Sequence, residues 1–232
     1  SVDSDWGGIS DSHSCCDVGR EKESMPNLDL SQAEFLFHSA ALADATLFVY
    51  QFSGRESLSQ PFEFQVDLVC DDPNLDLEAP IGQAACLTLR GRTFDGGRYQ
   101  RYVHGVIERF VQIGAGIRQS RYQATLVPTI KQLAFTRNSR IFQKLSSPDV
   151  TKQVLSEDKI PSDWVSQLLH GSYGPRDYCV QYQESDLNLI QRLWEEDGIF
   201  YFFEHERDKD KLVLGDGGHA FSTLPVYEEL RL

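Results

Sequence analysis

Three consecutive acidic residues, Glu195, Glu196 and Asp197, form the densest acidic cluster in a part of the chain that is expected to be ordered. Paired carboxylates can act as general acid and base, so the cluster raises the hypothesis of a hydrolase. Neighbouring residues on a helix point about 100° apart, however, and cannot face one scissile bond together. We therefore expect a solvated helix end. Because negative charge at a helix C-terminus opposes the macrodipole, an interface salt bridge, for example with Arg192, is a further explanation.

Histidine offers a second kind of chemistry. His104 precedes Gly105 in a β-favouring run and could act as a general base or a metal ligand. It has no His, Cys or carboxylate at ligand spacing, so local packing or hydrogen bonding explains it better. The turn from Asp216 to His219 contains two glycines and could hold a cation. The sequence has no G-x-S-x-G motif, phosphate loop or dinucleotide fingerprint, and it pairs no nucleophile with a base.

The cysteines indicate a reduced compartment rather than a disulfide framework, because their number is odd and none has C-x-x-C spacing. They are Cys15, Cys16, Cys70, Cys86 and Cys179. The last three fall in apolar or alternating runs, and we expect them to be small buried side chains. The adjacent pair near His13 lacks the usual spacing of metal ligands. We expect neither a metal nor a cofactor.

Charge and composition limit the class of protein. The 232 residues carry a formal charge of −13, which opposes binding to nucleic acid or anionic lipid and suits a basic or polar protein partner. An apolar fraction of 41% is sufficient for a core in one large or two small domains. No window approaches the roughly 18 consecutive apolar residues of a membrane span, and a secretory signal pattern is missing. We expect neither membrane insertion nor export through such a signal.

A strand, a helix and a hairpin must position the acidic cluster. Tyr178, Val180 and Tyr182 alternate with polar neighbours, which predicts a half-buried strand. Ser185 or Asp186 can cap the helix that follows. Its apolar residues at helical spacing are Leu187, Ile190, Leu193 and Trp194, and Gly198 supplies a left-handed C-terminal cap.

The hairpin consists of an aromatic run, 199–203, a charged tip, 204–211, and a second apolar run, 212–214. Alternation along a strand sends only every second ring to one face. Half of these rings should therefore lie in the core, and the others should form a ligand surface or a subunit interface, of which we favour the interface.

The preceding part of the chain is dominated by short strands. Turn signals separate β-favouring runs without long helices between them, and this pattern predicts an antiparallel barrel or sandwich rather than a βαβ core. The runs are 47–52, 62–68, 85–89, 102–107 and 122–126. Residues 30–42 predict a short helix or an extended lead-in. Ser147-Pro148-Asp149 predicts the start of a helix, with Ser147 as N-cap.

Five segments in the same order resemble the VgrG family of type VI secretion spike proteins, which are related to phage tail hubs. The longest of them joins Val180–Asp186 to Arg192–Tyr201. The others are Phe52–Phe62, Val103–Ile107, Tyr122–Pro128 and Arg140–Gln143. The resemblance covers roughly 47–229. It implies structural or interaction roles for Gln181, Glu184, Ser185, Asp186, Arg192, Glu195, Glu196, Gly198, His104 and Gly105.

The resemblance implies a mainly β fold with short helices, built from antiparallel β-barrel hub-like lobes of which the second is incomplete. We expect a flexible leader or added segment over 1–30, a first barrel lobe over 31–145, and a linker helix with the strand, helix and hairpin lobe over 146–232. The single methionine, Met25, suggests that the natural start lies there.

The function that the resemblance implies is that of a non-catalytic, homotrimeric adaptor between the hexameric Hcp tube and the spike. A monomer is compatible with a shortened chain. Further implied partners are baseplate proteins such as TssK and effectors or adaptors. Assembly would take place in the bacterial cytoplasm, before secretion into the medium or a target cell. The alternatives are a contractile phage tail hub and a β-barrel hydrolase or carbohydrate-binding domain.

Overall fold

The computed structural model describes residues 34–42, 47–92, 98–116 and 119–222. The chain divides into two compact units, Ser1–Gln32 and Ala33–Leu232, and all described residues belong to the second. The expected leader over 1–30, including His13, Cys15 and Cys16, lies outside the described residues. Among those residues, no helix is long and apolar enough to cross a membrane.

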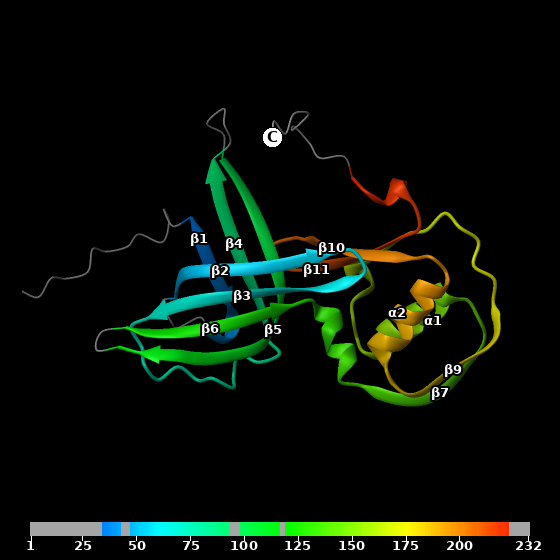
Figure 1. The fold of residues 1–232 in the computed structure, drawn as a ribbon, viewed down its shortest axis with the longest axis horizontal. Coiled ribbons are helices and arrows are strands. Elements are labelled where there is room, and N and C mark those ends of the chain that lie inside the picture. The colour runs from blue at the N-terminus through cyan, green and yellow to red at the C-terminus, as the bar shows by residue number, and fades with distance from the viewer. Residues whose placement is uncertain (1–33, 43–46, 93–97, 117–118, 223–232) are drawn as a thin grey trace, which may run out of the picture. The chain divides into compact units, whose positions relative to one another are not determined.

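The first half of the described unit is a six-stranded antiparallel sheet with the order β1-β4-β5-β6-β3-β2 (Figure 1). Its strands are β1 (Phe35–Ser39), β2 (Phe48–Ser57), β3 (Gln60–Cys70), β4 (Ala84–Arg92), β5 (Arg98–Ala115) and β6 (Ser120–Val127). All five predicted runs are strands. Residues 30–42, predicted as a helix or an extended lead-in, contain β1 followed by a short 3-10 turn, η2 (Ala40–Leu42).

The sheet is curled into a half-barrel because β5 changes partner along its length. Residues 98–106 pair with β4, and residues from Val106 onward pair with β6. A register shift between Ile107 and Arg109 marks the corner, as β-bulges commonly do. The curl brings the two edge strands together, so that the rings of Phe35 in β1 and Phe52 in β2 lie 5.3 Å apart.

The second half combines two helices with two small sheets. In the first sheet β7 (Arg137–Leu145) pairs with β9 (Arg176–Ser185), and in the second β10 (Phe200–His205) pairs with β11 (Asp210–Gly215), which is parallel to β8 (Val165–Leu168). The helices are α1 (Ser147–Glu157) and α2 (Asp186–Glu196), and the short 3-10 elements are η3 (Thr129–Ala134), η4 (Ser162–Trp164) and η5 (Gly218–Ala220). The mainly β fold with short helices is confirmed.

Both helices begin at serine caps. The predicted cap of α1, Ser147, is wrong by one residue, because Ser146 is the N-cap and forms a capping box with Asp149. Ser147 is instead the buried first residue of the helix. For α2 the cap is Ser185, and Gly198 has the predicted left-handed conformation, with φ of +71°.

The predicted buried face of β9 is wrong. Tyr178, Val180 and Tyr182 are exposed, and Cys179 and Gln181 are buried in their place. The alternation itself is as predicted, but the inward face of this strand carries a small thiol and an amide. The amide is buried because it takes part in a polar network centred on Asp186.

The two halves have separate hydrophobic cores that meet at one residue. The largest buried side chain of the second core is Trp194, and the first core contains Phe62 and Leu68. Phe203 packs against both cores. The domain boundary expected after residue 145 stays a prediction. The second core already includes Ile130, from η3.

Candidate functional site

The turn from β9 into α2 places the carboxylate of Asp186 at the centre of a buried polar network. Asp186 Oδ1 accepts hydrogen bonds from Gln181 Nε2 at 2.6 Å and from Arg140 Nη2 at 3.0 Å. Both of its oxygens accept from Asn138 Nδ2, at 3.1 and 3.2 Å. Asp186 and Gln181 are each 1% exposed. A buried charge with this many donors is stabilised by its partners and locks β7, β9 and α2 together.

This network also changes a neighbouring carboxylate. Burial, and then the negative charge of Asp186, raise the pKa of Asp158 above its ordinary value. Arg140 balances the acids, since it also forms an ion pair with Glu157 at the end of α1. Sequence reasoning did not single out Asn138, Asp158 or Arg140 as site residues. Arg140 was included only in a segment that resembles the VgrG family.

A second line of ion pairs runs along the surface of α2. Arg192 bridges Glu184, at 2.7 Å, and Glu196, at 3.2 Å. Arg176 bridges Glu196, at 2.6 Å, and Asp197, at 2.8 Å. The hydrogen bond to Glu184 raises the pKa of Arg192 above its ordinary value. The acidic end of α2 is thus offset by two arginines within the same chain, which explains how the unfavourable charge at the helix C-terminus is tolerated.

Glu195 is not part of these ion pairs. It lines a hollow of about 500 Å³ together with Trp194, Gly198 and Tyr201. Glu195 and Glu196 therefore face different surroundings, as expected for neighbours on a helix, and do not form an acid/base pair. Tyr201 belongs to the core side of this hollow, where burial raises its pKa to about 12 and the hydrogen bond from Gln191 opposes the rise.

His104 and Gly105 lie apart from Asp186, at the corner of β5. His104 Nδ1 is 3.2 Å from Asp210 Oδ1, and both side chains are buried. The same carboxylate accepts hydrogen bonds from Thr129 N, at 2.6 Å, and Thr129 Oγ1, at 2.7 Å. Asp210 thus connects the first sheet with the hairpin. Because the threonine hydroxyl donates to the carboxylate rather than to the imidazole, this arrangement does not form a nucleophile and base pair.

Gly105 allows the sheet to turn this corner. A Cβ at this position would lie 2.4 Å from the backbone oxygen of Val127, on β6, and 3.2 Å from Phe62 Cζ. Such a contact is far inside van der Waals distance, so the close approach of β5 and β6 requires glycine.

A second histidine, His205, ties the end of β10 to the first sheet. Its Nε2 lies 3.1 Å from Glu56 Oε1, and Glu56 also pairs with Arg101. The hydrogen bond with His205 lowers the pKa of Glu56, against the opposing effect of burial. Sequence reasoning included His205 only in the charged tip of the hairpin and did not single out Glu56, Thr129 or Asp210, because no local pattern connects residues so far apart in the chain.

The turn from Asp216 to His219 is occupied by internal hydrogen bonds. Asp216 accepts from Gly171 N at 2.6 Å, from Tyr173 Oη at 2.7 Å and from His170 N at 2.9 Å. The Gly171 amide, and then the Tyr173 hydroxyl, lower the pKa of Asp216 to about 2. Burial, and then the bond to Asp216, raise the pKa of Tyr173 to about 12.

Neither the histidines nor the cysteines gather into a metal centre within the described ranges. His170 and His219 stack with ring centroids 3.6 Å apart, but no group of three or more His, Cys, Asp or Glu suited to a metal occurs among the described residues. The described cysteines are buried free thiols, as predicted, and burial raises the pKa of Cys86.

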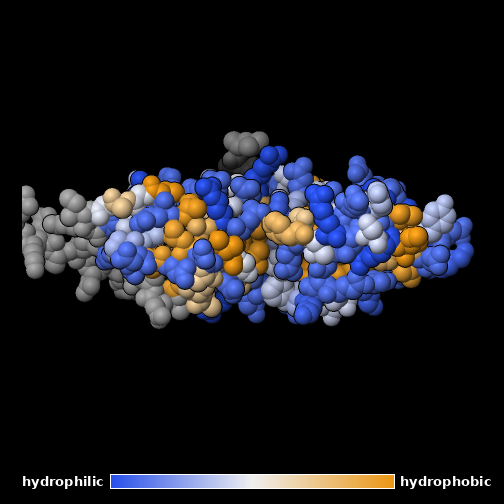
Figure 2. Space-filling view, turned by 90° about the horizontal axis from the view of Figure 1, so that it is seen from below, coloured by the Kyte–Doolittle hydropathy of each residue, from blue (hydrophilic) through white to orange (hydrophobic). Residues whose placement is uncertain are grey.

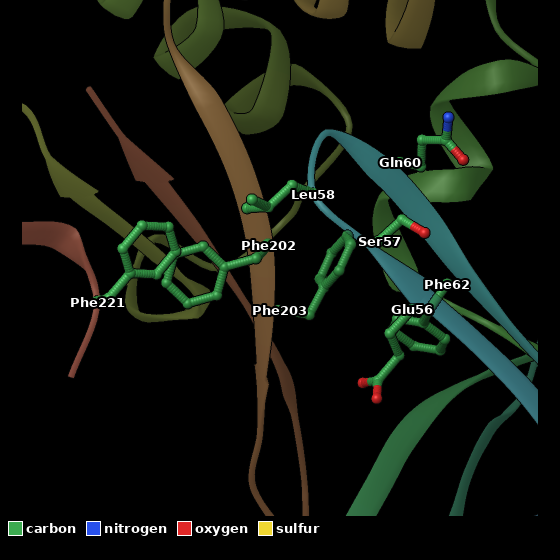
Figure 3. A pocket seen from close by; sticks show the side chains of 8 residues that line it. All are labelled: Glu56, Ser57, Leu58, Gln60, Phe62, Phe202, Phe203 and Phe221. Carbon is green, nitrogen blue, oxygen red and sulfur yellow. The ribbon is translucent and has the colours of Figure 1, made fainter. Parts of the chain in front are cut away.

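The aromatic run of β10 divides between core and surface, as predicted. Tyr201 and Phe203 pack in the cores, whereas Phe200 and Phe202 stack on Phe221 with centroids 5.2 and 5.5 Å away. Figure 3 shows Phe202 and Phe221 side by side on one wall of a groove, opposite the β2–β3 turn that carries Leu58. The groove has a volume of about 290 Å³.

Comparisons with known proteins place these elements in context. The family model described as phage tail baseplate hub (GPD) matches residues 55–232. The chain is 40% identical over 176 residues to the type VI secretion system spike protein VgrG4b of Pseudomonas aeruginosa, an alignment that covers 76% of this chain and 21% of that protein. It is 36% identical over 186 residues to the spike protein VgrG1b of the same organism, covering 80% and 24%. The chain thus spans less than a third of the length of these relatives.

A solved structure shares the fold. The E. coli c3393 protein, a component of the type VI secretion system with structural similarity to the T4 bacteriophage tail proteins gp27 and gp5, superposes with a TM-score of 0.72 at 24% identity. The superposition covers 81% of this chain and 51% of that one.

Proposed function

Because this chain belongs to the phage tail baseplate hub family, we propose that it forms the hub region of a type VI secretion spike and acts as a structural adaptor between the spike and the tube. The observation that carries the proposal is the 40% identity to a type VI spike protein over 76% of the chain. In this chain a curled sheet and a strand, helix and hairpin unit have polar groups that hold elements together, which suits a structural part.

The mechanism that we propose is geometric. Three copies, with two lobes each, would present six similar surfaces and so match a threefold spike to a hexameric tube of Hcp. The chain's part in this is rigidity, because Asp186, Asp210 and Asp216 each join segments that are distant in sequence. We assign the motif residues from Gln181 to Gly198, with His104 and Gly105, to this structural role and propose that the region itself catalyses no reaction.

Partners and location follow from the same proposal. The partners would be other copies of the chain, Hcp, baseplate proteins such as TssK, and effectors or adaptors. The negative net charge favours basic or polar protein partners over nucleic acid. The protein would assemble in the bacterial cytoplasm and leave the cell through the type VI apparatus.

A contractile phage tail hub is the second candidate, favoured by the family description itself. The two functions share a fold, so fold alone does not separate them. A chimeric spike protein can separate the two functions. Residues 55–222 would replace the matching region of VgrG4b, and the release of tube protein into the medium would be measured.

The type VI proposal expects the chimera to restore release in a strain that lacks its own spike proteins. The control is an equivalent chimera that carries the matching region of a phage tail hub, which is expected to be inactive. A chimera that is stably produced and forms trimers, yet releases no tube protein, would contradict the proposal and favour the phage function.

A further inference from the structure

The two-stranded sheet of β7 and β9 exposes an apolar face to solvent. Three large side chains of β9 lie on it, Tyr178, Val180 and Tyr182, with exposures of 68%, 45% and 73%. Ile141 of β7 pairs with Val180 and is 62% exposed. We call this surface the outer ribbon face, and its members are Ser139, Ile141, Gln143, Tyr178, Val180 and Tyr182.

The outer ribbon face carries no charged residue, although the chain has a net charge of −13. The charged groups of the two strands lie on the inner side or at the end of the ribbon. Arg140 points inward to Asp186, and Lys144 pairs with Asp177 beyond the apolar positions. Figure 2 shows hydrophobic side chains gathered at this end of the molecule between hydrophilic surroundings.

The face is held rigidly from behind. Phe142 and Cys179 on the inner side belong to the hydrophobic core of the helices, and Gln181 belongs to the Asp186 network. A fixed surface loses little conformational entropy when it binds a partner. Tyrosine combines a large apolar ring with a hydroxyl and is enriched in protein interfaces for that reason.

Natural β-proteins usually place charge on exposed edges and faces of small sheets, because an uncharged one invites association. Among the described residues, β7 and β9 pair only with each other. An uncharged aromatic face on such a ribbon is the pattern of a surface that is covered in the assembled protein.

We propose that the outer ribbon face is a contact surface for a second copy of this chain. Two copies that each carry −13 repel each other wherever acidic surfaces meet, so their contact favours a surface without charge. A basic partner would instead be matched by the acidic surfaces. The inference rests on the proposed function, which requires several copies in one hub, and adds the location of their contact.

The size of the face sets the strength of the contact. Eight paired positions at about 3.4 Å each and a width of roughly 10 Å give on the order of 300 Å², well below the ~800 Å² per partner of a standard interface. The face is therefore the centre of a larger contact, and self-association of the isolated chain should be weak.

The test compares Tyr182→Lys with Tyr50→Lys. Tyr50 is also an exposed tyrosine on a strand, at 64%, so both variants change the net charge equally. Each substitution makes the net charge less negative by one, and this change by itself strengthens association between the copies. Sedimentation equilibrium of the purified chain up to millimolar concentration is expected to show weak self-association that Tyr182→Lys weakens by about tenfold or more and Tyr50→Lys does not weaken.

A photo-reactive residue at position 178 supplies a second measurement. It is expected to give an adduct of two chains, also in the presence of purified tube protein. The inference is overturned if the wild-type chain neither associates nor cross-links, if both variants behave alike, or if the adduct contains tube protein instead of a second copy. Tube release by the chimera reports on the proposed function separately, so a functional spike with an unaffected Tyr182→Lys variant would overturn only the contact surface.

Discussion

Single aspartates connect parts of this chain that lie far apart in sequence. Asp186 holds Arg140, 46 residues away, and Asp210 holds His104, 106 residues away. Asp216 accepts backbone hydrogen bonds from the loop at His170 and Gly171. Hydrogen bonds to charged groups are stronger than those between neutral groups, so each aspartate fixes the position of more than one element.

Removal of the buried carboxylate of Asp186 should strongly destabilise the folded protein. Asp186→Ala removes the buried carboxylate that pairs with the Arg140 guanidinium and leaves one N–H of the Gln181 amide without its acceptor, so we expect a loss of about 3 kcal/mol in the free energy of unfolding. Urea denaturation of the wild type and the variant measures this loss. The matched control is Asp177→Ala, whose carboxylate is 83% exposed and pairs with Lys144, and which should cost less than about 0.5 kcal/mol. Equal losses for the two variants would contradict a central role for Asp186.

The lowered pKa of Asp216 predicts that the stability of the protein depends on pH. Its pKa falls from 3.8 to about 2 on folding, so its contribution is complete above about pH 4 and is lost as the pH falls through about 2. Asp216→Asn should therefore melt at a lower temperature than the wild type at pH 7, and the two melting temperatures should converge between pH 4 and pH 2. A difference that stays constant down to pH 2 would show that the carboxylate charge is not responsible.

At the level of elements, both ends of α2 are set by local chemistry. Ser185 caps the first turn, accepting a hydrogen bond from Asn188 N at 3.2 Å. Gly198 ends the helix in the left-handed conformation and lets the chain enter β10. The helix carries Trp194 into the core, so its limits determine how the second half of the molecule packs.

Gly198→Ala should destabilise the protein by about 1 kcal/mol, because an L-residue is disfavoured at φ of +71°. A Cβ there would meet no atom within 4 Å, so the effect comes from the backbone alone. Gly174 provides the control, since its Cβ would also meet nothing and its φ is not in the left-handed region. Thermal unfolding of the two alanine variants compares them, and an equal effect would rule out the backbone explanation.

At the level of the whole molecule, the curled sheet and the helical half are joined by a small number of contacts. Phe203 packs against both cores, Ser59 N donates to Tyr201 O at 2.8 Å, and Asp210 ties the hairpin to β5 and η3. We expect the two halves to unfold together, because these contacts are buried or partly buried and each half covers part of the other.

Asp210→Ala should weaken this coupling. Cys70 is buried in the first core and Cys179 in the second, so pulsed thiol labelling followed by peptide mass spectrometry reports on each half. In the wild type both cysteines should become labelled at the same urea concentration. In the variant Cys179 should be labelled at a lower concentration than Cys70. Asp208→Ala, at the exposed hairpin tip, is the control and should retain coincident labelling.

Much of the fold follows from local patterns. The strands of the curled sheet, the helix that ends at Gly198 and the β10–β11 hairpin all have strong periodicity or cap signals, and these depend only on neighbouring residues. The exact cap of α1 was misplaced because Ser146 and Ser147 are adjacent serines, and only the Asp149 side chain decides between them. The strand β8 carries no comparable signal and forms because β11 offers it a partner.

The sequence by itself determined the family, five strands of the curled sheet and the helix that ends at Gly198. The tertiary structure alone decided which face of β9 is buried and what the motif residues contact. A period of two specifies that side chains alternate but not which side meets the core. In this strand the polar network of Asp186 draws Gln181 inward and leaves Tyr178 and Tyr182 in solvent. The partners of Asp186 and His104 could not be found locally, because long-range contacts exist only once the chain has folded.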